Sequence, residues 1–440
     1  MASLRRTAVQ PFLRSRARSF WCSSVESITS NLLKSSETSG SEICPGGPSL
    51  TALEDLITAL PPQPVSLPML LASARTNSPK NQLLNAQFVR RELTARRALV
   101  LKLLHSFPAP LDREPAVEKV ASIYWERLKD LCSLPPLMAV GDEVAFTAQM
   151  KLSNAQVRDQ TGEEEAMCVT ALGTLYESIQ QGGTTEAERV AVDRRLDAVF
   201  LARIGMRFLL EHYVASSEPP RDGFAGIVEM RLSPHDLCEQ IAHETRQRLV
   251  DAYGAAPPVR VVSGVGRDET FTFVPSHIRY IVGELLKNSC VATMRHHDRL
   301  VSSGRLAADA PLRPVRVVVA VSEGLVQIKL ADEAGGIRRS SLSNVWSYRP
   351  LNSKWWKPED GLSLPVVRLC CKYFNGSLAL VPVEGFGTDC YVTLNRLPQD
   401  NSERINLYED DSVVEPSLRS FLFDAQSRRV AVAAPQSQKS

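Results

Sequence analysis

Residues 284–295 read ELLKNSCVATMR and residues 332–337 read DEAGGI, and these two stretches decide how the second half of the chain is interpreted. Glu284, Lys287 and Asn288 are spaced i, i+3 and i+4, which places them on one face of a helix with apolar residues behind them. Asparagine competes for backbone hydrogen bonds in mid-helix, so Asn288 indicates a compensating role, such as a hard-cation ligand. We expect a helix over about 278–295; an ordinary exposed polar face is the alternative.

The second stretch, DEAGGI, has residues suited to contact with a ligand. Asp332 follows a predicted strand, and its carboxylate can accept a hydrogen bond from an exocyclic amine. Gly335 and Gly336 let the backbone come close to a ligand. Further along, Gly361 opens GLSLP just before a predicted helix, which suits phosphate binding by backbone amides, and residues 385–389 read GFGTD. A plain turn explains any one motif, but four in this order predict a nucleotide site.

Composition limits the class of protein. The 440 residues are 44% hydrophobic and 23% charged, which is enough to bury two domain cores. We find no apolar run near the roughly 20 residues that span a bilayer, so no membrane span is expected. The nine cysteines are scattered without metal-binding spacing, which favours thiols in a reducing compartment.

The first 25 residues differ from the rest. They contain five arginines and no acidic residue before Glu26, with apolar residues between the arginines. This composition predicts a mitochondrial presequence; a basic nucleic-acid-binding arm is the alternative. Without these arginines the formal net charge falls from +2 to −3, so we expect no nucleic-acid partner.

Residues 50–215 have the periodicity of helices. Apolar residues recur at helical intervals in four stretches that end at proline or glycine, which predicts an antiparallel bundle. The stretches are 84–103, 117–131, 163–181 and 185–213. Residues 216–220 read SSEPP and are the expected linker.

A mixed domain is expected after the linker. Ser233 and Pro234 are typical of a helix start, and Gly254 of a helix end. Strand patterns then occur in pairs around short glycine-containing turns, 315–321 with 325–330 and 377–383 with 389–394. Helices combined with antiparallel pairs predict an α+β sandwich and exclude a doubly wound sheet.

Together these motifs resemble those of the GHKL fold, the ATPase fold of histidine kinases, Hsp90-type chaperones and gyrase B. Four longer runs narrow the likeness: RIGMRFLLEH at 203–212, GFAGIVEMRLSP at 223–234, YGAAPPVRV at 253–261 and ELLKNSCVAT at 284–293. They are similar to the mitochondrial 2-oxoacid dehydrogenase kinases, and the branched-chain member looks somewhat closer than the pyruvate members. The similarity covers about residues 60–398.

The resemblance implies a four-helix amino-terminal domain and a GHKL ATP-binding domain, acting as a serine kinase in the mitochondrial matrix. By this likeness Glu284 is the general base, Asn288 ligates Mg²⁺ and Asp332 binds the adenine amine of ATP. Other residues are implied as an additional catalytic residue or as nucleotide contacts: His212, Lys287, Gly335, Gly336, Ile337, Gly361, Leu362 and Thr388. The implied partners are the E1 substrate and the lipoyl-bearing E2 core of a 2-oxoacid dehydrogenase complex, with the kinase a homodimer.

The chain also departs from the family pattern. Val291 stands where members usually carry arginine, Ala334 replaces the first glycine of DxGxG, and the family's GxGxGLP keeps one glycine of three. The family's supporting histidine aligns with Tyr213, and His212 comes one place earlier. Because one residue rotates a helical side chain by about 100°, either of the two is a candidate to face Glu284.

Two classes of function follow. The first is an active kinase with domains at 1–25 (presequence), 50–218 (helical bundle), 225–398 (ATP-binding domain) and 401–440 (flexible tail). The second is a non-catalytic relative that keeps the fold and weak nucleotide binding. Retention of Glu284, Asn288 and Asp332 favours the first.

Overall fold

The computed structural model describes residues 23–38, 46–74, 78–107, 114–155, 186–348 and 363–403. The chain divides into two compact units, Met1–Arg404 and Ile405–Ser440, and every described residue belongs to the first. Most of the predicted presequence, the predicted helix at 163–181, Gly361, Leu362 and nearly all of the predicted tail lie outside the described residues.

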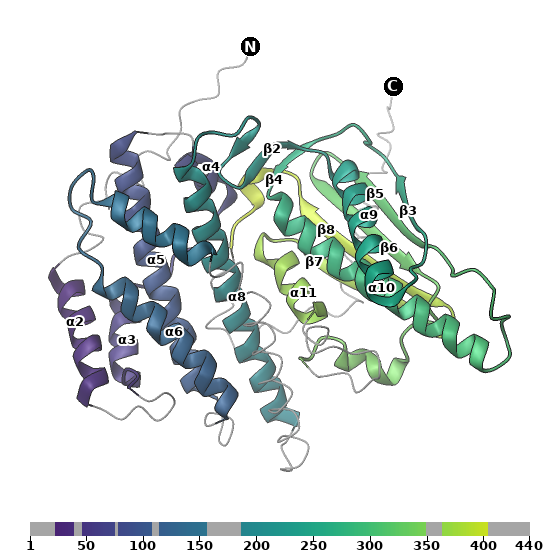
Figure 1. Ribbon diagram of the computed structural model, residues 1–440, viewed down its shortest axis with the longest axis horizontal. Coiled ribbons are helices and arrows are strands. Elements are labelled where there is room, and N and C mark those ends of the chain that lie inside the picture. The colour runs from purple at the N-terminus through teal and green to yellow at the C-terminus, as the bar shows by residue number, and fades with distance from the viewer. Residues whose placement is uncertain are drawn as a thin grey trace, which may run out of the picture. The chain divides into compact units, whose positions relative to one another are not determined.

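The amino-terminal part is helical. Its elements are α2 (Ser23–Thr38), α3 (Leu50–Ala59), α4 (Leu67–Ala74), α5 (Pro79–His105), α6 (Pro115–Ser133), a helical segment at 143–155 and α8 (Glu186–Ser217). Helix α5 packs against α3, α6 and α8 (Figure 1). The predicted helices at 84–103, 117–131 and 185–213 are therefore confirmed, and each is longer than its apolar pattern.

Helix α5 buries an unusual number of charges. Arg96 is completely buried and binds Glu403, with both carboxylate oxygens 2.6 Å from guanidinium nitrogens. Glu403 Oε2 also accepts a hydrogen bond from the Val65 amide at 2.9 Å. Gly205 of α8 leaves room for this pair, because a Cβ there would overlap the Arg96 guanidinium. The end of the described chain is thus tied to the helical part.

The carboxy-terminal part contains two sheets. A small one has the order β1 (Phe224–Ala225), β2 (Val228–Leu232), β4 (Phe271–Phe273). The larger has the order β3 (Val259–Ser263), β5 (Val315–Val321), β6 (Leu325–Asp332), β8 (Gly387–Asn395), β7 (Ser377–Val383). Strand β3 runs parallel to β5 and the other neighbours are antiparallel, so both predicted strand pairs are confirmed.

One face of the larger sheet is apolar. Buried residues alternate along its strands and pair across them, for example Val319 with Ile328 and Ile328 with Val392. This face is covered by α9 (Pro234–Tyr253), α10 (Pro275–Ser302) and α11 (Ser363–Tyr373) (Figure 1). Helices on one side of a mainly antiparallel sheet confirm the predicted α+β class.

The ends of α9 follow the sequence signals. Ser233 is the N-cap and its hydroxyl accepts a hydrogen bond from the Asp236 amide, Pro234 is in the first turn, and Gly254 closes the helix with φ +77°. Glycine is favoured there because residues with a Cβ atom are destabilised in the left-handed conformation.

Side chains also join α8 to α11 and to the segment between β6 and α11. Asp197 accepts a hydrogen bond from Tyr348 at 2.5 Å and pairs with Arg368 of α11 at 3.3 Å. Phe208 stacks on Tyr373, with ring centroids 5.1 Å apart. A short 3-10 helix, η3 (Arg339–Asn344), precedes Tyr348, and another, η5 (Pro398–Asp400), follows β8.

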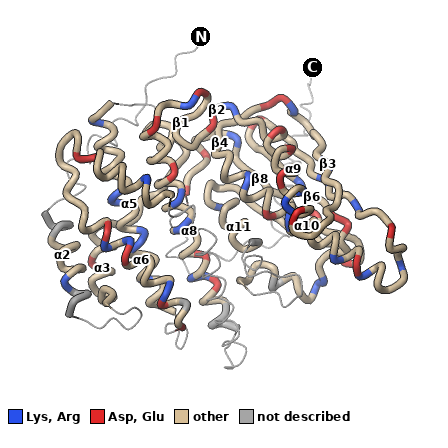
Figure 2. Tube along the Cα trace, in the orientation of Figure 1, with Lys and Arg blue, Asp and Glu red and all other residues tan. Residues whose placement is uncertain are grey.

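No helix among the described residues is long and apolar enough to cross a membrane. Lysine and arginine are interspersed with aspartate and glutamate along the described elements (Figure 2). This mixture is in keeping with the small formal net charge of +2.

Candidate functional site

Helix α10 carries the predicted acid and amide as the spacing requires. Ile281, Val282, Leu285 and Leu286 are buried on its inner face. On its outer face the Glu284 side chain is 25% exposed and the Lys287 side chain 27% exposed, and Lys287 Nζ lies 3.1 Å from Glu284 Oε2. The carboxylate is therefore accessible and has a cation beside it.

Asp332 lies at the end of β6, opposite Thr388 of β8. Its Oδ1 accepts hydrogen bonds from the amides of Ala334 at 3.1 Å and Thr388 at 3.2 Å. Both Asp332 and Thr388 are buried. Burial raises the pKa of the Asp332 carboxyl above its ordinary value, although these hydrogen bonds oppose the shift. The aspartate is thus fixed in orientation by backbone amides.

Ser289 connects the two motifs. This buried residue follows Asn288 on α10, and its hydroxyl hydrogen-bonds to the Asp332 carboxylate. The helix that carries Glu284 and Asn288 and the strand end that carries Asp332 therefore meet at one place. Sequence reasoning missed Ser289; a small polar residue on the buried side of a helix was the available signal.

The glycine turns beside Asp332 pack against each other. The Gly335 amide donates to the Phe386 carbonyl at 3.0 Å, and the Gly385 amide donates to the Gly335 carbonyl at 2.8 Å. Gly336 has φ +70°, and a Cβ there would overlap the Val383 carbonyl oxygen. A Cβ at Gly387 would overlap the Asp332 carbonyl oxygen in the same way. These glycines allow the DEAGGI and GFGTD turns to touch backbone to backbone.

The alanine in the first of these turns is well accommodated. Ala334 is buried, and Asn375 is the one non-glycine residue with positive φ in the described ranges. Ala334 therefore has a backbone conformation open to any residue, and its methyl group causes no strain. The departure from DxGxG at this position is compatible with an intact site.

His296 is a further neighbour that sequence reasoning missed. Its ring lies beside Gly335, where a Cβ would come within 2.8 Å of it. The pKa of His296 is lowered by burial and by Arg299 and Arg313, with Asp332 acting in the opposite direction. His296 follows Asn288 by two helical turns on α10, and this spacing was the signal in the sequence.

His212 and Tyr213 both form side-chain hydrogen bonds to the helical part of the chain. His212 Nε2 lies 3.0 Å from Ser73 Oγ, and its Nδ1 is buried without a hydrogen-bond partner in the described part of the chain. Burial lowers the pKa of His212 to about 4, which keeps its ring neutral near pH 7. The Tyr213 hydroxyl bonds to Thr147 Oγ1 at 2.6 Å. Both side chains at the one-residue offset are thus held by partners in the helical part.

The remaining predicted residues fall in two groups. Ile337 is half-buried directly after the paired glycines. Gly361 and Leu362 lie outside the described residues, and α11 begins at Ser363 directly after them. The described site therefore consists of the outer face of α10, the end of β6 and the turn before β8.

The donors present suit a nucleotide and a hard cation. Asn288 offers an amide oxygen and Glu284 a carboxylate, which are the ligand types that Mg²⁺ accepts. The glycine turns provide close approach to the backbone, and Asp332 is a buried acceptor with a fixed orientation. Neither the geometry nor the donors conflict with ATP and Mg²⁺.

Comparison with known proteins gives the family. A family model described as mitochondrial branched-chain alpha-ketoacid dehydrogenase kinase matches residues 64–229. The mitochondrial pyruvate dehydrogenase (acetyl-transferring) kinase of Arabidopsis thaliana is 31% identical over 354 residues, which cover 76% of this chain and 90% of the relative. The corresponding isozyme 1 of Rattus norvegicus is 25% identical over 372 residues, 80% of this chain and 82% of the relative. The protein belongs to the mitochondrial 2-oxoacid dehydrogenase kinase family.

Proposed function

We propose that this protein is a mitochondrial serine/threonine kinase that transfers the γ-phosphoryl group of ATP to the E1 subunit of a 2-oxoacid dehydrogenase complex and thereby down-regulates it. The observation that carries the proposal is the hydrogen bond from Ser289 to Asp332, which joins the Glu284–Asn288 helix to the Asp332 turn. Relatives named as kinases over most of this chain favour catalysis over a non-catalytic scaffold.

The residues divide the work as follows. Glu284 accepts the proton of a substrate serine hydroxyl as the serine oxygen bonds to phosphorus and ADP leaves. Asn288 ligates Mg²⁺, and Lys287 moves from Glu284 to the phosphates. Asp332 accepts a hydrogen bond from the adenine amine, and Thr388 supports that position. Bound Mg²⁺ supplies neutralisation of phosphate charge.

The glycine turns complete the nucleotide site in this proposal. Gly335, Gly336 and Ile337 line it beside Asp332, and Gly361 and Leu362 contribute amides toward the phosphates. His212 has no catalytic role here. Its hydrogen bond to Ser73 and its neutral ring support a structural role between α8 and α4.

The larger organisation is also a proposal. Residues 1–25 are a presequence removed on import into the matrix, residues 50–218 a four-helix bundle domain, residues 225–398 a GHKL ATP-binding domain, and residues 401–440 a tail. The relatives' names give mitochondrial location and action on pyruvate dehydrogenase. We extend these to a homodimer that docks on the lipoyl-bearing E2 core.

Calorimetry tests the nucleotide site. Wild-type protein should bind ATP only with Mg²⁺, and Asp332→Ala should abolish binding. Asp268→Ala, which removes an exposed aspartate between β3 and β4, is the matched control and should bind normally. Absence of ATP binding by the wild type would refute the kinase proposal.

Labelled ATP and a purified E1 subunit test transfer. We expect labelled E1 with the wild type and none with Glu284→Gln, which should still bind ATP. If the wild type binds ATP with Mg²⁺ but leaves E1 unlabelled, the non-catalytic alternative replaces the proposal.

A further inference from the structure

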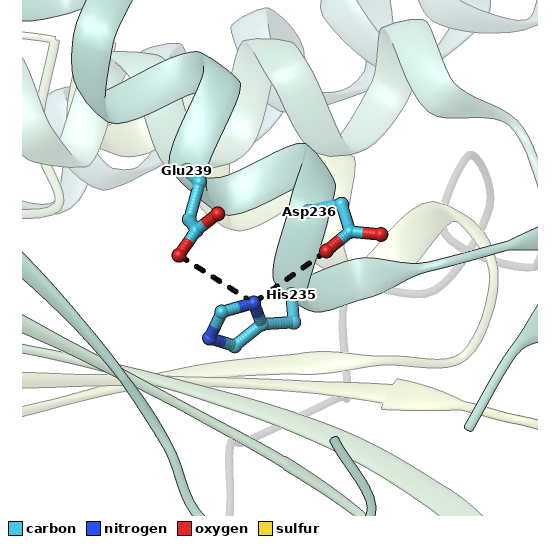
Figure 3. A group of neighbouring side chains, drawn as sticks. All are labelled: His235, Asp236 and Glu239. Carbon is cyan, nitrogen blue, oxygen red and sulfur yellow. Dashed lines mark ion pairs between the residues drawn. The ribbon is translucent and has the colours of Figure 1, made fainter. Parts of the chain in front are cut away.

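The start of α9 brings together three residues that could hold a metal ion. His235, Asp236 and Glu239 occupy positions i, i+1 and i+4 in the first two turns, after the Ser233 N-cap and Pro234, and one ligand atom of each lies within 4.8 Å of the others. Figure 3 shows the His235 ring beneath the two carboxylates, with its Nδ1 toward both. None of these residues belongs to the site on α10.

The buried histidine points at this cluster without a hydrogen bond. His235 is only 3% exposed, and its Nδ1 has no hydrogen-bond partner in the described ranges. Nδ1 lies 3.7 Å from Asp236 Oδ1 and 3.8 Å from Glu239 Oε1. Both distances exceed the roughly 3.2 Å limit for a good N–H···O bond. Leaving a buried polar atom unsatisfied is costly, so this Nδ1 requires an explanation.

The two carboxylates are also available. Their side chains are 68% and 53% exposed, and within the described part of the chain neither pairs with lysine or arginine. Both stand in the first turn or just after it, where negative charge offsets the positive end of the helix dipole that would otherwise repel a cation. The cluster therefore offers one nitrogen and two oxygens of formal charge −2.

The spacing is close to that of a coordinated ion. Zn²⁺ bonds nitrogen and oxygen at about 2.0–2.2 Å, which puts neighbouring ligand atoms about 3.3–3.6 Å apart in a tetrahedral arrangement. The observed separations of 3.7 and 3.8 Å need only small rotations of two exposed side chains. Three protein ligands leave the other position to water, as in open zinc sites.

We propose that His235, Asp236 and Glu239 bind a divalent transition-metal ion of the Zn²⁺ type at the junction of β2 and α9. Imidazole selects such ions over Mg²⁺, whose preferred ligands are all oxygen. The ion joins the buried His235 ring to the exposed turn and stabilises the start of α9. It is separate from any Mg²⁺ bound with nucleotide.

Titration of the full chain with Co²⁺, without nucleotide and followed by absorbance, tests the proposal. Co²⁺ held by nitrogen and oxygen ligands absorbs only in the visible range, whereas cysteine ligation adds a near-ultraviolet charge-transfer band. The wild type should bind one equivalent of Co²⁺ without that near-ultraviolet band. Zn²⁺ should displace the bound Co²⁺, and Mg²⁺ should not. Glu239→Gln removes one exposed ligand without disturbing the core and should weaken binding at least about tenfold.

The chain contains a matched control. His297 Nδ1 lies 3.8 Å from Asp298 Oδ1, a neighbouring pair like His235 and Asp236 but without the second carboxylate that Glu239 provides. Asp298→Asn should leave Co²⁺ binding unchanged. Equal affinity in the wild type and Glu239→Gln, cysteine ligation, or no stoichiometric binding would each overturn the proposal. Calorimetry with ATP and Mg²⁺ should give the same affinity for Glu239→Gln and wild type, so failure here leaves the kinase proposal untouched.

Discussion

Helices α5 and α10 both carry charged residues near their middle, but α5 buries its charge whereas α10 keeps its charges accessible to solvent. On α5, Arg96 is completely buried, and its partner Glu403 comes from the far end of the described chain. On α10, Glu284 and Lys287 pair within one turn and each stays about a quarter exposed. A buried charge needs a permanent partner, whereas an accessible pair can exchange its partner for a ligand.

The largest effect is expected from breaking the buried pair. Glu403→Gln removes the closer of the two buried carboxylates around Arg96 and leaves Glu92 at 3.5 Å. It should lower the free energy of unfolding by about 3–5 kcal/mol, measured by urea denaturation. The double variant Arg96→Met/Glu403→Leu should recover part of this loss, because it removes both charges of the pair while Glu92 keeps Arg91 as a partner. If the double variant loses the sum of the single effects, the pair is not coupled and the comparison with α10 fails.

The accessible acid should show the reverse behaviour. Glu284→Gln should lower phosphoryl transfer to E1 by about 10²–10⁴-fold by removing the general base. Its unfolding free energy should change by less than about 1 kcal/mol, because the pair with Lys287 is partly exposed.

Glu126→Gln is the control for that variant. Glu126 pairs with Lys129 at the same i, i+3 spacing but on α6. It should leave transfer unchanged. An equal loss of transfer in both variants would mean that the defect is general and not due to a missing base.

Buried His212 should make the free energy of unfolding depend on pH. Burial lowers the folded-state pKa of His212 to about 4, as it does for His277. Since the unfolded pKa is about 6.5, the neutral ring's contribution is complete above 6.5 and is lost as the pH falls toward 4, on the order of 3 kcal/mol for each histidine. Urea denaturation from pH 7 to 4 should show this loss, and His212→Gln should reduce its slope.

The same variant separates structure from catalysis. His212→Gln should transfer phosphate within about threefold of the wild type at pH 7.5, a change of less than about 1 kcal/mol. If phosphate transfer falls by more than about a hundredfold while ATP binding and folding are retained, His212 takes part in the reaction.

The titration of Asp332 should give the smallest of these effects on stability, and its sign is opposite to that of His212. Its folded pKa is raised by burial, so the folded state gains stability as the pH falls through that pKa, whereas the carboxylate needed for the adenine amine is lost. ATP affinity measured by calorimetry should therefore decline as the pH is lowered from neutral toward the raised pKa of Asp332, while protonated Asp332 itself stabilises the fold. A pH-independent ATP affinity would contradict the acceptor role.

Local signals in the sequence predicted much of the fold. Ser233, Pro234 and Gly254 bound α9 as expected, and both strand pairs formed around their glycine turns. Such features depend on neighbours in the chain. The parallel pairing of β3 with β5 and the burial of Arg96 were not predicted, because each depends on residues far away in sequence.

The candidate site shows the same division. The spacing of Glu284, Lys287 and Asn288 was visible in the sequence because a helix fixes it. Ser289 and His296 were missed because their importance arises only when α10 meets the turn after β6. Whether His212 or Tyr213 faces Glu284 was left open by the sequence, because periodicity gives the angle of a side chain about its own helix and says nothing of the neighbouring helix.

The pair between Arg96 and Glu403 also bears on the order of synthesis. The two residues are separated by 307 positions, and Arg96 is buried with two acidic partners, Glu92 on the same helix at 3.5 Å and Glu403 at 2.6 Å. A ribosome releases α5 long before residue 403, so the helical half emerges with Glu92 but without the closer of these two carboxylates. The final arrangement around Arg96 must therefore wait for the translation of Glu403.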